Sequence, residues 1–106
     1  MVPESAKAVA VIQQQLKELD QIFQDTMETL NTVSGMERVA KWRMRTITLL
    51  SQAIGPQAGQ DFARVQPGPS FTNDLVEEFT DFIDTFKLPL QALSKRVAAS
   101  PPPGGG

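Results

Sequence analysis

The sequence predicts an all-α protein: an up-down bundle of three main helices with one additional short helix. In two long segments, apolar residues recur at alternating steps of three and four, as they do on the buried side of amphipathic helices. A shorter segment between them carries two apolar strips, which suits a helix with neighbours on both sides. Turns rich in glycine and proline separate the segments, so each is expected to form its own helix.

The first helix is expected over about residues 5–33. Pro3 and Ser5 are residue types that favour a first helical turn. A heptad-like apolar seam follows, with Thr26 in its one vacant slot; the seam consists of Val9, Ile12, Leu16, Leu19, Phe23, Leu30 and Val33. Ser34-Gly35 is expected to end this helix, because glycine best adopts the left-handed conformation that terminates helices.

The first helix is expected to be longer than its neighbour. At 1.5 Å per residue it would span about 43 Å, whereas the middle helix would span about 28 Å. The surplus seam is then either covered by the later helices and the chain ends, or paired with a second copy or a partner helix. The second alternative gives a candidate interface of apolar residues from the first and last helices: Leu16, Leu19, Phe23, Leu90 and Leu93.

The middle helix is expected over about residues 36–54. Its tryptophan, Trp42, predicts a core anchor, because the large apolar area of this side chain is usually buried. Four bases also lie on this helix, against one acid; they are Arg38, Lys41, Arg43 and Arg45. These bases either pair with acids of the last helix, lie solvated, or form a face that binds an anion such as a nucleotide or nucleic acid.

Gly55-Pro56 closes the middle helix, and a short helix is expected over about residues 57–65. Phe62 and Val65 are its large residues able to enter the core. The following Gln66 to Ser70 is rich in residues that break regular structure, so a loop is expected to reverse the chain there.

The last helix is expected over about residues 72–98, with Ser70 or Thr72 as its cap. Pro89 cannot donate the usual backbone hydrogen bond, which predicts a kinked continuation at this point. Five acids and no base lie between Asp74 and Asp84. Charge complementarity therefore predicts that this acidic half lies against the basic middle helix.

A single domain is expected over residues 1–98. Its predicted core consists of Leu16, Leu19, Phe23, Leu30, Trp42, Leu49, Leu50, Phe62, Leu75, Phe79, Phe82, Phe86, Leu90 and Leu93. Residues 99–106 end in three prolines and three glycines and are expected to be a flexible tail, either a linker to a following domain or a frayed terminus.

The composition restricts the chemistry that the chain can perform. Its 106 residues include no cysteine, histidine or tyrosine, which removes the commonest general base, the thiolate nucleophile and the sulfur and imidazole metal ligands. We therefore expect no enzyme activity, no catalytic residue, no metal and no cofactor. The net charge of −2 disfavours nucleic acid as a partner, and the absence of a long apolar stretch favours a cytoplasmic location without a transmembrane segment.

A run in the middle helix resembles a known class of domains. The order is Trp42-Arg-Met-Arg45-Thr46-Ile-Thr-Leu49-Leu50, then Gly55, Phe62 and a loop into an amphipathic last helix. It resembles small all-helical N-terminal domains of prokaryotic defence and signalling proteins, which precede an effector or nucleotide-binding module. The resemblance implies an adaptor or oligomerising role and carries no catalytic residues.

Two functions follow as hypotheses. The first is a non-catalytic protein-interaction or oligomerisation module, which binds a second copy or another helical protein. The alternative is an anion-binding helical domain that uses the basic middle helix.

Overall fold

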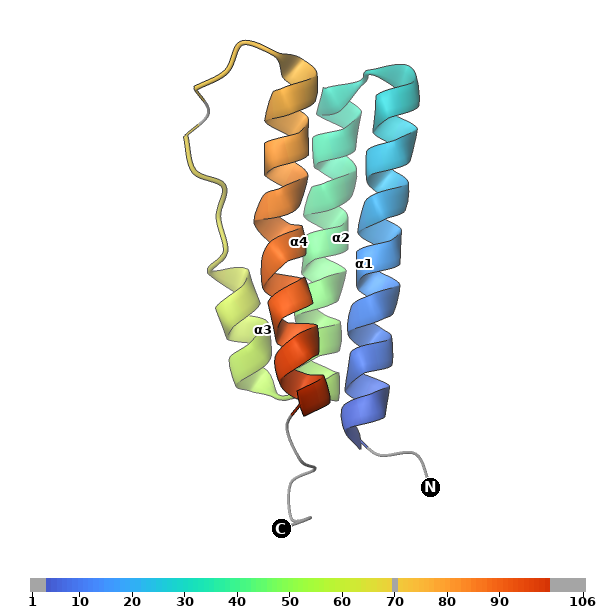
Figure 1. Cartoon of the computed structure of the whole chain (residues 1–106), viewed down its shortest axis with the longest axis vertical. Coiled ribbons are helices and arrows are strands. Elements are labelled where there is room, and N and C mark those ends of the chain that lie inside the picture. Colours follow the sequence, from blue (N-terminus) through green and yellow to red (C-terminus); the bar gives the residue numbers. More distant parts are fainter. Residues whose placement is uncertain (1–3, 70, 100–106) are drawn as a thin grey trace.

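The computed structural model describes residues 4–69 and 71–99. This part of the chain forms four helices and no strand: α1 (Glu4–Thr29), α2 (Thr32–Ala53), α3 (Pro56–Ala63) and α4 (Leu75–Ala99). Figure 1 shows the three long helices side by side: α1 runs in one direction, and α2 and α4 both run in the opposite direction. The short α3 lies against the lower half of the bundle and returns the chain toward the start of α4. The predicted all-α architecture of three long helices and one short helix is confirmed. The predicted tail lies almost entirely outside the described residues.

The turn between α1 and α2 lies earlier than the sequence predicts. α1 ends at Thr29, and Leu30 adopts a left-handed conformation with φ of 58°. Asn31 then caps α2, because its side chain accepts a hydrogen bond from the Ser34 backbone N–H at 3.1 Å. The predicted stop at Ser34-Gly35 is therefore wrong, and a leucine takes the conformation expected of the glycine.

Gly35 has a different role, inside the first turns of α2. It is buried, and a Cβ built on it would stand 2.5 Å from Thr26 Oγ1 and 2.9 Å from Phe79 Cζ. The absence of a side chain thus lets α1, α2 and α4 approach one another at this level. Close packing, rather than helix termination, explains the glycine.

The corrected bounds remove the expected surplus of helix length. The 26 residues of α1 rise about 39 Å, the 25 of α4 about 38 Å and the 22 of α2 about 33 Å. Neighbouring helices of nearly equal length can cover one another's apolar seams. The structure thus favours the alternative in which the seams close within the chain.

Trp42 occupies the centre of the core, as predicted, and its side chain is completely buried. The ring packs edge-on against Phe62 of α3 and Phe86 of α4, with centroid distances of 5.8 and 6.3 Å. Its indole N–H donates to the Gln15 carbonyl oxygen of α1 at 2.9 Å. All four helices therefore meet at this one side chain.

A buried polar network beside Trp42 sets how α1 and α2 align. The Gln15 side-chain amide donates to Thr46 Oγ1 at 2.8 Å, and the Thr46 hydroxyl donates to the Trp42 carbonyl oxygen at 2.8 Å. Leaving such groups unpaired would cost about 1–3 kcal/mol each, so a sliding of α1 along α2 is disfavoured.

The prediction of a core position is wrong for two residues, which lie at the end of the bundle, where no helix covers them. Leu30 is 60% exposed and Leu75 is 62% exposed. The other predicted core residues are buried or half-buried.

The start of α4 also differs from the prediction. Its cap is Asp74, whose Oδ1 accepts hydrogen bonds from the Val76 and Glu77 backbone N–H groups at 2.9 and 3.2 Å. Thr72 instead accepts a hydrogen bond from the Asp74 N–H, and Ser70 lies outside the described residues. α4 continues through Pro89 without interruption, which confirms the continuation, while the kink itself stays a prediction.

Candidate interaction groove

A groove runs between α2 and α4, and α3 fills only one end of it. α3 has 8 residues, against 22 in α2 and 25 in α4. It packs closely on α2 at Gly59, which lies against Ser51. A Cβ built on Gly59 would stand 2.9 Å from the Ile47 carbonyl oxygen. The other end of the groove, beside the first turns of α2 and α4, receives no helix (Figure 1).

Arg43 marks the boundary between the filled and open ends. Its guanidinium Nη2 donates to the carbonyl oxygens of Ala63 and Val65 at 2.7 and 2.6 Å, and so caps the end of α3. The same guanidinium lies over the Phe86 ring, 5.3 Å from its centroid. Arg43 therefore holds α3 and the beginning of the α3–α4 loop against α2 and α4.

The open end is a depression of about 640 Å³. Its walls are the start of α2, the first three turns of α4 and the described part of the α3–α4 loop. The apolar side chains that line it come from all three walls: Met36, Pro67, Pro69, Phe71, Leu75, Phe79 and Phe82. The depression is thus large enough for several side chains of a ligand.

Large apolar side chains around this depression are open to solvent. Phe71 is 95% exposed, and Met36 is 44% exposed. Leu30, Val33, Leu75 and Val76 are exposed at the same end of the bundle, where the α1–α2 turn meets the start of α4 (Figure 1). Several large exposed apolar side chains at one end of a domain are typical of interaction sites.

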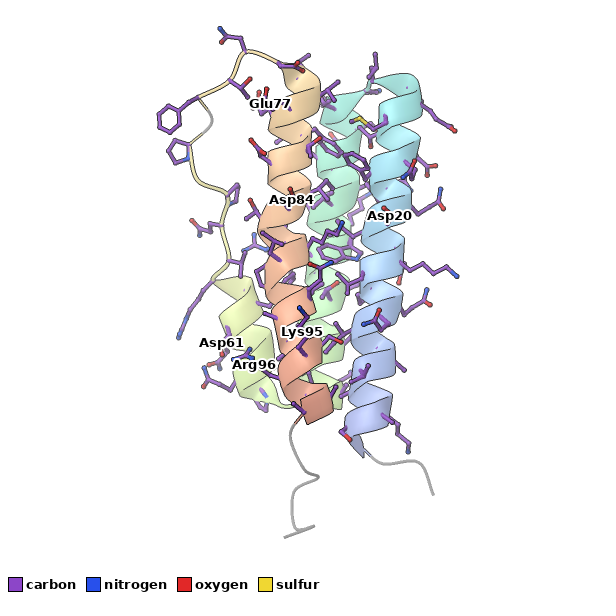
Figure 2. All side chains as sticks on the ribbon, viewed as in Figure 1. Asp20, Asp61, Glu77, Asp84, Lys95 and Arg96 are labelled. Carbon is purple, nitrogen blue, oxygen red and sulfur yellow. The ribbon has the colours of Figure 1, made fainter. Side chains whose placement is uncertain are left out.

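The rim of the depression is acidic. Glu77, Glu78 and Asp81 line it, and Figure 2 shows Glu77 near the start of α4. No ion pair between described residues involves any of the five acids from Asp74 to Asp84. Among the described residues, the acids of this half of α4 thus lack an ion-pair partner.

The predicted pairing of these acids with the bases of α2 is wrong, because Arg38, Lys41 and Arg45 lie beside α1 and Arg43 bonds to backbone carbonyls. Arg38 pairs with Asp25 at 3.0 Å, and Arg45 pairs with Glu18 at 3.4 Å. The pKa of Asp25 is lowered, chiefly by the hydrogen bond from the Gln21 side chain and also by that from Arg38.

The candidate anion-binding residues do not form one site. Arg38, Lys41 and Arg45 line a shallow depression of about 210 Å³ beside Glu18, so its positive charge is partly neutralised. Arg43 points to the other side of α2, where its guanidinium is engaged by the carbonyl groups of α3 and the loop. The structure thus brings together three of the four bases and separates the fourth.

The candidate interface residues are part of the core. Leu19 and Leu90 are fully buried, and Leu16, Phe23 and Leu93 are partly buried against the core cluster. These side chains are already covered by neighbouring helices of the same chain. Exposed apolar side chains lie instead at the open end of the groove.

Sequence reasoning missed Phe71 and Met36 as candidate binding residues. An aromatic residue directly after Pro-Gly-Pro-Ser, in a loop with no apolar periodicity, was the available signal for Phe71. Met36 carried no such signal, because its exposure follows from the shortness of α3. Only the arrangement of the helices reveals that no residue covers it.

Comparison with protein families, curated proteins and solved structures gives no match to this chain. Within residues 4–69 and 71–99, no helix is long and apolar enough to cross a membrane. The same residues contain no cluster of three acidic side chains placed to hold a metal ion.

Proposed function

We propose that this chain is a non-catalytic protein-interaction module that acts in the cytoplasm and binds its partner through the open end of the α2–α4 groove. The observation that carries the proposal is the gathering of exposed apolar side chains around a depression of about 640 Å³. Exposing Phe71 and Leu75 to water is unfavourable, and a partner that covers them would gain about 25 cal/mol per Å² of apolar area buried. The resemblance to N-terminal adaptor domains agrees with such a role.

Anion binding is the weaker alternative. Arg38 and Arg45 are already paired with carboxylates of α1, so an anion would have to displace Asp25 or Glu18. Nucleic-acid binding depends on several bases free to neutralise phosphates, and this face offers few.

Selection from an unbiased displayed peptide library tests the proposal. We expect peptides enriched on the wild-type chain to lose binding to the Phe71→Ser/Leu75→Ser variant, because both side chains are exposed and line the depression. The variant should keep its fold, which circular dichroism checks.

The matched control for this selection is Leu88→Ser. Leu88 is 60% exposed on the same helix as Leu75, but it does not line the depression. Enriched peptides should bind this control as they bind the wild type. The proposal fails if no peptide is enriched, or if enriched peptides bind the double variant as strongly as the wild type.

A further inference from the structure

We propose that the open end of the groove binds an amphipathic helix of a partner protein, with an apolar face and basic flanks, in the place that the short α3 leaves vacant. The inference rests on the proposed interaction function and adds the chemistry of the partner. The geometry, the apolar walls and the charge of the groove each support it.

The geometry sets the form and the length of the ligand. The walls are two helices and the described part of the α3–α4 loop, and none of these is a strand, so an extended peptide would find no strand edge to pair with there. Along α4 the wall from Leu75 to Thr85 rises about 15 Å, and Thr32 and Met36 of α2 line the opposite side. A helix of about 10 residues, or roughly three turns, matches the length of the α4 wall.

The lower end of the same groove shows how a helix fits. There α3 inserts Phe62 between α2 and α4, where its ring meets Trp42 and Phe86 at 5.8 and 6.2 Å. In the open end, Phe79 and Phe82 continue the same aromatic row along α4, with their centroids 6.1 Å apart. A partner helix with apolar residues at i, i+3, i+4 and i+7 would contact this row as α3 contacts Phe86.

The negative charge of the groove indicates which residues should flank the apolar face of the partner helix. Glu77, Glu78 and Asp81 line the open end, and no described base pairs with them. At the filled end, α3 and α4 carry opposite charges: Asp61 of α3 and Arg96 of α4 line one depression and lie near each other in Figure 2. A lysine- or arginine-flanked helix would complete this pattern at the acidic end.

A second copy of the chain does not supply such a helix from its described residues. The apolar faces of α1, α2 and α4 are buried in the core, and Arg38, Arg43 and Arg45 on α2 are already bonded to carboxylates or carbonyls. The ligand is therefore a helix of a different protein.

Three synthetic peptides of about 16 residues test the proposal by fluorescence anisotropy with the full chain. The first carries the apolar pattern with lysine flanks, the second carries the same pattern with glutamate flanks, and the third has lysine flanks with the apolar residues scrambled. We expect the first to bind about tenfold more tightly than either of the others, and added salt to reduce that preference over the acidic peptide.

Charge-reversal variants and serine variants of the protein test whether the peptides bind in the groove. Glu78→Lys/Asp81→Lys should weaken the basic peptide about tenfold and strengthen the acidic one. The control Asp20→Lys/Glu28→Lys makes the same change in net charge on α1 and should leave both affinities within about twofold. Leu75→Ser should weaken the basic peptide, whereas Leu88→Ser should not.

Equal binding of the basic and acidic peptides, or equal effects of the two charge reversals, would overturn the inference. In that case, library peptides that still depend on Phe71 and Leu75 would leave the interaction function standing without the basic helix. If the library selection enriches no peptide and none of the three synthetic peptides binds, both the interaction function and the basic-helix inference are overturned.

Discussion

Replacing Trp42 by alanine should lower the free energy of unfolding by about 3–5 kcal/mol. The side chain is completely buried and contacts residues of the three other helices, so its removal leaves a cavity bordered by Phe62 and Phe86. A domain of this size has about 5–15 kcal/mol in total, so the variant should lose a large part of its stability. Urea denaturation followed by far-ultraviolet circular dichroism measures the loss without using tryptophan fluorescence.

Two further variants separate packing from hydrogen bonding at this site. Trp42→Phe keeps an aromatic ring but removes the indole donor to the Gln15 carbonyl, and should cost less than the alanine variant. Met44→Ala, on an exposed position of the same helix, should change stability by no more than about 0.5 kcal/mol. A similar loss in Trp42→Ala and Met44→Ala would contradict the central place given to the tryptophan.

Replacing Gly59 by alanine should be the most damaging addition of a single methyl group to α3, costing about 1–3 kcal/mol. The added Cβ would clash with Ser51 Oγ and stand 2.9 Å from the Ile47 carbonyl oxygen. The serine hydroxyl can rotate away, but the backbone oxygen of α2 cannot, so α3 must move outward. Thermal or urea unfolding of the purified variant measures the cost.

Gly68 provides the matched control, because a Cβ there meets no atom within 4 Å. Gly68→Ala should be nearly neutral, within about 0.5 kcal/mol. Adding Ser51→Ala to Gly59→Ala should restore only part of the loss, since the contact with the Ile47 oxygen remains. Full rescue, or equal costs at both glycines, would contradict the close approach of α3 to α2.

The helix seams could be predicted from the sequence because burial imposes a regular spacing on apolar residues. Trp42, Phe79 and Leu90 lie where that spacing places them. The α1–α2 turn was predicted wrongly because glycine has two uses, and the sequence does not show which one applies at Gly35. Its closest neighbours, Thr26 and Phe79, lie on other helices, so only the packing reveals the reason for the glycine.

The candidate site was less predictable than the fold. Opposite charges on two helices indicate attraction only if the charged faces meet, and Arg38 and Arg45 of α2 pair with acids of α1 instead. Arginine is a residue type that commonly binds anions, yet the Arg43 guanidinium donates to backbone carbonyls of residues 20 and 22 positions away. The open groove follows from the shortness of α3 relative to its neighbours, which residue types alone do not indicate.

The central claim is that the open end of the α2–α4 groove is a helix-binding site. Titrating the ¹⁵N-labelled chain with the basic amphipathic peptide and recording amide chemical shifts tests it most directly. We predict changes at Met36, Phe71, Leu75 and Phe82, and unchanged shifts at Asp20 of α1, which does not line the groove. Changes centred instead on Arg38, Lys41 and Arg45, or spread evenly over the helices, would contradict the claim.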